Sequence, residues 1–362
     1  MKLRVFDALQ DPKRISSIDV LRGIAIISVV LFHFGYLPYG SLGVDLFFVI
    51  SGVLIGGILL KEFETSDRIN FFKFFFSRGL KIWPSYYTLI ILGDVIAWLL
   101  YRNSHPDQII PLWDMKRYLL FYQNYTGVPF HYSFDVIWSL CVEEHFYILF
   151  PLMLLFVQFF FKDANKRKWL LIFILAVIVM GWIFKPLSFH FMHGQDTYSG
   201  THNRIDALAL GVLFSFVLRY RSGMITKLKR GYFYAIAGAI LVIILAALDI
   251  ILKNVIYTKI LFHSLVPLCF FMIIAGMYNY DFSRFKIMRF IAYYSYNWYL
   301  WHILFRSFIY DAIGKNVAGL IIYLILTFSV AMFFTIIVEE QVLKYRSALL
   351  TKMFSRHTIK NV

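Results

Sequence analysis

Long runs of apolar residues constrain this chain more than any other feature of its sequence. A helix of about 20 apolar residues crosses the hydrocarbon core of a bilayer. Ten runs come close to that length, at 16–35, 42–61, 83–101, 137–161, 168–185, 204–220, 232–252, 259–279, 291–311 and 317–341. With 60% hydrophobic and 16% charged residues, the chain is also unlike a soluble domain. We therefore predict an all-α integral membrane protein with about ten transmembrane helices.

The basic residues indicate how these helices are oriented. Most of the 36 Lys and Arg residues lie near the two termini and in every second connection, whereas the other connections hold few, among them Lys185. Because basic loops stay in the cytoplasm, we predict that both termini are cytoplasmic and that the protein is a multi-pass protein of the cell membrane. The net charge of +15 then belongs to loops beside a lipid bilayer, and no nucleic-acid partner is expected.

Three shorter segments complete the predicted organisation. Residues 70–83 and 281–289 mix aromatic and basic residues, which is typical of short interfacial helices. Pro84 suits the first turn of a helix, so we expect the third span to begin there. The loop at 103–133 is long enough to cover an external opening. We predict a membrane-embedded domain at 1–345, a short basic cytoplasmic tail at 346–362 and no soluble domain.

The first run carries ionisable residues, which are costly in a span and therefore indicate function. Arg22 and His33 are eleven positions apart, so they share a helix face and lie about 16 Å apart along the axis. The alternative is an arginine that reaches the membrane surface and a hydrogen-bonded core histidine. Ser16 and Asp19, three residues apart, resemble a capping box at the start of this helix. Asp19 is also expected to pair with Arg22 one turn on.

The fourth run contains an adjacent pair of glutamates. Ser139, Glu143 and Tyr147 recur every four residues and so share one helix face. Glu144 points about 100° away, so we predict that Glu143 faces the site. The alternative places both acids near the outer interface, in contact with water.

Polar groups also occur in the sixth and ninth runs. Arg204 near Asp206 is consistent with a ligand contact or with a structural ion pair. His302 shares a face with Ser295 and Tyr299, and is either a site residue or a hydrogen-bonded core histidine. His190, His193 and His202 lack a thiol or carboxylate partner at suitable spacing, so no metal site is predicted.

Together these segments resemble the acyltransferase 3 family of integral membrane proteins. The resemblance rests on IDVLRGIAIISVVLFH, GVDLFFVISGVLI, WSLCVEEHFY, RIDALALGVL and SYNWYLWHILF, which occur in the family's order along nearly the whole chain. Two features depart from the family's pattern. Position 145 is His where Gln is more common, and no hydrolase-like domain is appended, so we expect the membrane domain to complete the transfer itself or with a separate envelope partner protein.

The resemblance implies transfer of an acyl group, commonly acetyl from acetyl-CoA, to a hydroxyl of a carbohydrate or glycolipid. Acyl-CoA is then a donor substrate, and no tightly bound cofactor is expected. A hydroxyl needs a base to take its proton, and a histidine suits this role near neutral pH. We therefore predict catalytic roles for His33, Arg22 and Glu143. The predicted substrate-binding residues are Asp19, Asp45, Ser51, Ser139, Tyr147, Arg204 and His302.

Two other functions are compatible with these residues. A transporter of glycans or acyl groups also needs ionisable residues along its path. A non-catalytic subunit of a polysaccharide assembly complex would not depend on His33.

Overall fold

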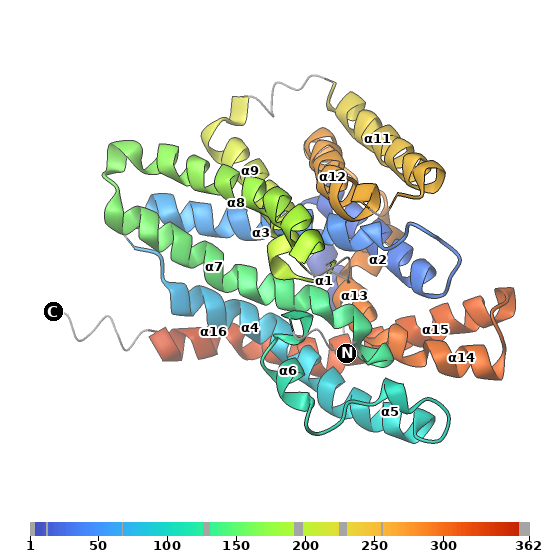
Figure 1. Ribbon diagram of the computed structural model, residues 1–362. Coiled ribbons are helices and arrows are strands. Elements are labelled where there is room, and N and C mark those ends of the chain that lie inside the picture. Colours follow the sequence, from blue (N-terminus) through green and yellow to red (C-terminus); the bar gives the residue numbers. More distant parts are fainter. Residues whose placement is uncertain are drawn as a thin grey trace. The chain divides into compact units, whose positions relative to one another are not determined.

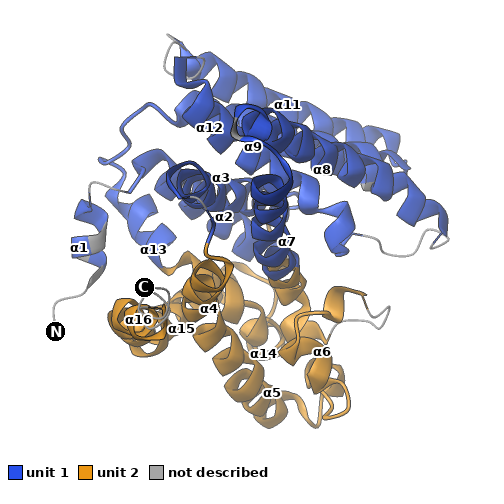
Figure 2. Ribbon diagram, turned by 90° about the vertical axis from the view of Figure 1, so that its left-hand side faces the viewer, with its two compact units in different colours: residues 1–32, 37–69, 142–293 blue, residues 33–36, 70–141, 294–362 orange. Residues whose placement is uncertain are grey.

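The computed structural model describes residues 4–11, 14–66, 68–125, 131–191, 198–223, 230–254 and 256–354. Within these ranges the chain forms helices and turns and no strand, which confirms the predicted all-α class (Figure 1). The chain divides into two compact units, coloured separately in Figure 2. The first comprises residues 1–32, 37–69 and 142–293, and the second comprises 33–36, 70–141 and 294–362.

Nine helices or parts of helices build the described part of the first unit. It holds α1 (Arg4–Gln10), all but the last residue of α2 (Ser16–His33), α3 (Leu42–Thr65), most of α7 (Trp138–Phe160), α8 (Asp163–Phe191), α9 (Ile205–Tyr220), α11 (Gly231–Leu252), α12 (His263–Met277) and the first half of α13 (Lys286–Trp301). A short turn, η5 (Thr201–Asn203), precedes α9, and a π-helical turn, η6 (Tyr257–Phe262), precedes α12.

Helices α3 and α9 form the core of the first unit. Gly52 and Gly211 lie where the helices cross, and a Cβ at either would collide with the backbone of the other helix. Ser215 of α9 donates a hydrogen bond to the carbonyl of Val53 at 2.7 Å. Small residues at such crossings let backbones approach closely in membrane proteins, where apolar burial alone does not hold helices together. This contact fixes the polar ends of α3 and α9 beside each other.

The second unit combines short turns with two interrupted helices. Its longer elements are α4 (Phe71–Thr88), α5 (Asp94–Tyr101), α6 (Met115–Leu119), the second half of α13, α14 (Arg306–Ala312), α15 (Val317–Phe334) and α16 (Glu340–Phe354). π-Helical turns, η1 (Leu89–Gly93) and η8 (Thr335–Glu339), join α4 to α5 and α15 to α16. The remaining turns are η2 (Pro106–Gln108), η3 (Gln123–Tyr125), η4 (Tyr132–Ile137) and η7 (Ile303–Phe305).

The prediction that a helix begins at Pro84 was wrong. Helix α4 begins at Phe71 and includes Pro84. The side chain of Asn70 caps it by accepting a hydrogen bond from the Lys73 amide at 3.0 Å. This cap starts the helix three turns earlier than the proline would, and the interfacial segment and the third span form one helical stretch.

Within the described ranges, eight helical stretches are long and apolar enough to cross a membrane, and they coincide with eight of the ten predicted runs. The other two predicted spans fall on α9 and α13, which have 16 residues each. A helix of 16 residues is about 24 Å long, shorter than the hydrocarbon core of about 30 Å. The fold class is therefore confirmed, whereas the count of ten spans and their orientation stay predictions. In the predicted tail, α16 extends to Phe354, and residues 355–362 lie outside the described ranges.

Candidate functional site

The second unit brings His33 and His302 together. His33 is the last residue of α2, and His302 follows the end of α13. Nε2 of His302 lies 3.2 Å from Nδ1 of His33, with the ring centroids 5.0 Å apart. The His302 side chain is fully buried. The family resemblance implied a role for His33, and His302 was predicted as a substrate-binding residue, but their spacing of 269 positions gave no signal that the two rings would be in contact.

The surroundings of His302 determine which nitrogen carries its proton. Nδ1 of His302 lies 3.0 Å from the carbonyl oxygen of Trp298 and 2.8 Å from that of Tyr299. Carbonyl oxygens only accept, so Nδ1 is the donor, and in the neutral ring Nε2 is the acceptor. His33 must then donate from Nδ1, which leaves its Nε2 as the unprotonated nitrogen. This tautomer gives His33 a basic nitrogen on the side away from His302.

Ser139, predicted to bind substrate, also lies in the second unit. Its hydroxyl is 2.7 Å from the Tyr299 hydroxyl, which donates to the carbonyl of Val136 at 2.7 Å. Both side chains are buried. These bonds tie the start of α7 to the last turn of α13, directly before His302, so Ser139 helps to hold the histidine pair in place.

The first unit contains a chain of hydroxyl and carboxyl groups. The Ser51 and Tyr147 hydroxyls are 3.0 Å apart, and the Tyr147 hydroxyl lies 3.2 Å from a carboxylate oxygen of Glu143. Glu143 and Tyr147 are four residues apart on α7, as the predicted shared face requires. Glu143 is half-buried and Glu144 is buried. His145, the departure from the family's pattern, contacts the Thr201 hydroxyl through Nδ1 at 2.7 Å.

The first unit also holds two buried ion pairs along α3, α8 and α9. Asp45 pairs with Arg204 at 2.5 Å, and Lys185 pairs with Asp206 at 2.5 Å. Each of the four side chains is at most 3% exposed. The guanidinium of Arg204 also lies 4.4 Å from the ring centroid of Tyr198. Buried charges are tolerated when they are paired in this way.

Lys185 lies within a helix and not in a connection. It was counted with the charges of an outer connection, whereas α8 continues through Pro186 to Phe191 and carries Lys185 into the buried pair, and the side of the membrane stays a prediction. The signal available was the single lysine at the end of an apolar run, facing the acidic residue of RIDAL. Its partner Asp206 lies in the first turn of α9, where a carboxylate also suits the helix dipole.

Asp19 and Arg22 lie on α2 in the first unit. The carboxylate of Asp19 contacts Arg14 at 2.6 Å and Arg289 at 3.3 Å. The Ser16 hydroxyl, expected to cap the helix, bonds instead to Asp281 at 3.0 Å and accepts from the Phe282 amide at 2.8 Å. Asp19 therefore connects the start of α2 to α13. Arg22 is half-buried one turn further along α2.

The histidines considered for a metal have other surroundings. Nε2 of His202 lies 2.8 Å from the Ser188 hydroxyl, and burial lowers the pKa of His202 from its ordinary value. His193 lies outside the described residues. Within the described residues, no group of three His, Cys, Asp or Glu side chains has the arrangement of a metal site.

Comparison with known proteins shows which family this chain resembles in sequence. The sequence profile of the acyltransferase 3 family, described as an acyltransferase domain, matches residues 15–338. The chain belongs to the acyltransferase 3 family. The family's match covers every residue predicted for the site, in both units. No solved structure matches the chain.

Several curated relatives share parts of this family domain. The chain is 29% identical over 229 residues to O-acetyltransferase OatA of Staphylococcus aureus (strain NCTC 8325 / PS 47), which covers 58% of this chain and 36% of that protein. It is 27% identical over 336 residues to a protein named "Putative O-acetyltransferase SACOL0978" of strain COL, which covers 86% of this chain and 54% of that protein. The chain thus spans about half or less of the length of these relatives.

Proposed function

We propose that this family member is an O-acyltransferase that moves an acetyl group from acetyl-CoA to a hydroxyl of a carbohydrate or glycolipid. The family domain and the O-acetyltransferase names of the relatives support the reaction class. The observation that carries the proposal is the hydrogen-bonded pair of His33 and His302. It supplies a histidine with a fixed tautomer, which is what a general base requires.

His33 acts on the acceptor in this proposal. Nε2 of His33 takes the proton of the acceptor hydroxyl while the hydroxyl oxygen attacks the thioester carbonyl. The carbon–sulfur bond then breaks, and the proton passes from His33 to the departing thiolate. The products are an acetyl ester and free CoA. His302 touches His33 and acts as a positioning residue, since its own Nδ1 is held by two carbonyl groups.

Arg22 acts on the donor in this proposal. It precedes His33 by eleven residues on the same helix, which corresponds to about 16 Å along the axis. An extended pantetheine arm has a comparable length. A guanidinium forms planar, paired hydrogen bonds with phosphate oxygens, so Arg22 suits the donor's phosphate end while the thioester reaches His33.

The contacts of the other predicted residues indicate either a substrate-binding or a structural role. Glu143, Tyr147 and Ser51 form one hydrogen-bonded chain, and we propose that it orients a substrate hydroxyl. The burial of Asp45 and Arg204 in one ion pair supports a structural role in holding α3 to α9. Asp19 is similarly engaged with Arg14 and Arg289. We propose that the protein works in the cell membrane, with or without a separate envelope partner protein, and without a tightly bound cofactor.

Thiol release tests the proposed reaction. Protein in lipid nanodiscs is given acetyl-CoA and a mixture of oligosaccharides, and free CoA is measured with a thiol-reactive dye. We expect release that depends on the oligosaccharides, and mass spectrometry should find acetyl esters on them. Oligosaccharide uptake into proteoliposomes without thiol release would contradict the proposal and support a transporter.

A further inference from the structure

The turn after His33 is enclosed by side chains of α14 and the segment that follows it. The Tyr310 hydroxyl donates a hydrogen bond to the carbonyl of Phe34 at 2.8 Å. Gly35 has a φ of +78°, in the left-handed region that favours glycine. The ammonium of Lys315 occupies the space that a Cβ at Gly35 would need. The chain that leaves His33 therefore passes directly beneath a lysine.

A second cation lies beside the same turn. The guanidinium of Arg306 is 3.5 Å from the carbonyl oxygen of His33, and its central carbon lies 4.1 Å from the ring centroid of Tyr132. Arg306 is half-buried and Lys315 is exposed. Among the described residues, no carboxylate forms an ion pair with either cation. The nearby carboxylate of Asp311 is 3.0 Å from His105 instead.

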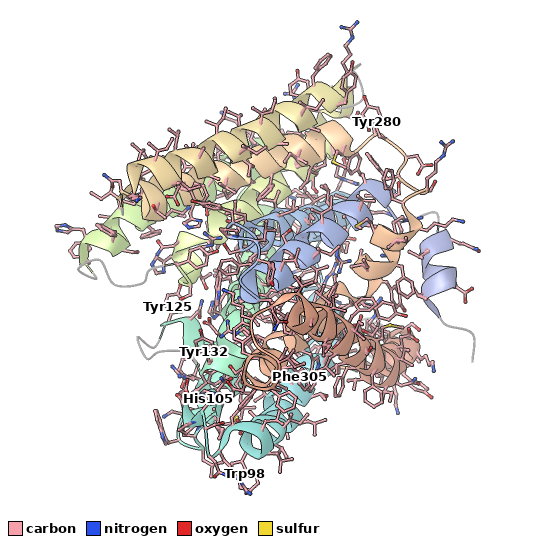
Figure 3. The ribbon with its side chains drawn as sticks, turned by 90° about the vertical axis from the view of Figure 1, so that its right-hand side faces the viewer. Trp98, His105, Tyr125, Tyr132, Tyr280 and Phe305 are labelled. Atoms are coloured by element: carbon pink, nitrogen blue, oxygen red, sulfur yellow. The ribbon has the colours of Figure 1, made fainter. Side chains whose placement is uncertain are left out.

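Aromatic rings border these two cations. Tyr132 is 47% exposed and Tyr36 is 42% exposed. Tyr36 stacks on Phe34 with ring centroids 5.9 Å apart, and Phe34 packs edge-on against Tyr310 at 5.0 Å. Tyr132 begins η4, which packs against η7, and Figure 3 labels Tyr132 and Phe305, the residue before Arg306. Exposed tyrosines combine a flat apolar face with a hydrogen-bonding hydroxyl, which suits the face of a sugar ring.

We propose that Arg306, Lys315, Tyr36 and Tyr132 form the acceptor site and that it takes an acidic glycan, meaning a sugar that carries a carboxylate or a phosphate. The inference rests on the proposed function and specifies its acceptor. A guanidinium binds either anion through two parallel hydrogen bonds, and the rings hold the sugar beside it. Because Arg306 touches the backbone of His33, an anion bound there brings the sugar's hydroxyls within reach of the proposed base.

Pairs of charged and neutral saccharides show how much the charge contributes to binding, apart from the sugar ring. One pair is a disaccharide of glucuronic acid and N-acetylglucosamine and its methyl ester, and the other is glucose 1-phosphate and glucose. Dissociation constants are measured for the protein in nanodiscs, without acetyl-CoA. We expect the charged member of at least one pair to bind about tenfold or more tightly than its neutral partner, as a charge-assisted hydrogen bond provides. The pair whose two members differ in affinity shows whether the site prefers a carboxylate or a phosphate.

Two variants test whether Arg306 causes this preference. Arg306→Gln should reduce the ratio of the two dissociation constants to about one, and Arg306→Lys should restore part of it. The control is Arg102→Gln, because Arg102 stacks on Trp98 at 4.3 Å in the same unit and lies outside the proposed site. It should keep the wild-type ratio. Thermal unfolding of each variant shows whether it has folded.

The outcomes are distinguishable from those of the thiol assay. Equal binding of the members of both pairs by the wild type would overturn this inference. An equal loss with Arg102→Gln and Arg306→Gln would overturn it as well. Binding that discriminates, without any thiol release, would support the site and contradict the proposed reaction.

Discussion

Two polar clusters, one in each unit, differ in how their groups are paired. In the first unit each charge in the core between α3, α8 and α9 meets an opposite charge, as Asp45 meets Arg204 and Lys185 meets Asp206. Around His33 in the second unit, the polar groups in contact are the half-buried ring of His33, the buried ring of His302 and backbone carbonyls. The cations beside them, Arg306 and Lys315, pair with no carboxylate of the described chain.

This difference separates structural charges from groups available for chemistry. A buried charge with a fixed partner has its interactions satisfied and contributes to the packing of helices. A neutral imidazole in a fixed tautomer can accept a proton, and an uncompensated cation can bind an anion. We therefore expect variants of the two buried ion pairs, Asp45–Arg204 and Lys185–Asp206, to change mainly stability. Variants around His33 should change mainly turnover.

The largest effect on stability is expected from Asp45. Asp45→Ala leaves the Arg204 charge buried without its partner and should lower the free energy of unfolding by about 3–5 kcal/mol. The double variant Asp45→Leu with Arg204→Met should recover most of that loss. Denaturant unfolding in detergent measures both.

An exposed pair in the same unit provides the control for Asp45. Arg167 lies 3.1 Å from Glu64, with the arginine 64% exposed. Arg167→Ala should change the free energy of unfolding by less than about 1 kcal/mol. A loss at Arg167 equal to that at Asp45 would show that burial of the pairs does not matter.

Arg22 is expected to affect donor binding. Arg22→Ala should raise the KM for acetyl-CoA by about tenfold or more and also lower turnover, because a charged hydrogen bond to the donor is lost. Lysine should restore only part of the affinity, since it lacks the planar fork. Steady-state kinetics with varied acetyl-CoA measures this. An unchanged KM in Arg22→Ala would place the donor elsewhere.

Glu143 and Glu144 distinguish the two faces of α7. Glu143→Gln should lower kcat by about tenfold, because it weakens the chain through Tyr147 to Ser51. Glu144→Gln should lower kcat less. Initial rates at saturating acetyl-CoA compare the two variants, and the reverse ranking would remove Glu143 from the site.

The smallest effect is expected from His202 and concerns pH. Burial lowers the pKa of His202 in the folded protein, so the unfolded chain binds more protons between the two pKa values. The contribution to stability is therefore complete above the ordinary histidine pKa of about 6.5 and is lost as pH falls through the folded-state value. Thermal unfolding between pH 8 and pH 5 should show a shallower loss for His202→Asn. An unchanged slope would assign the pH dependence to other groups.

The sequence predicted the helices better than it predicted their contacts. Apolar runs identify spans because the bilayer fixes their length, and the recurrence of Ser139, Glu143 and Tyr147 follows from the helical period. The pairs Lys185–Asp206 and His33–His302 depend on which helices pack together, which one helix's periodicity does not encode. Pro84 misled the prediction because the cap at Asn70 begins the helix earlier.

The coupling between His33 and His302 tests the central claim most directly. It is measured as kcat, at saturating acetyl-CoA and acceptor, for His33→Ala, His302→Ala and the double variant. His33→Ala should lower kcat by about 10²–10⁴-fold, the usual contribution of a general base. His302→Ala should lower kcat as well, but it should cause no further loss once His33 is absent, because it acts only through that ring. Additive losses in the double variant, or a His33→Ala protein with wild-type kcat, would contradict the account.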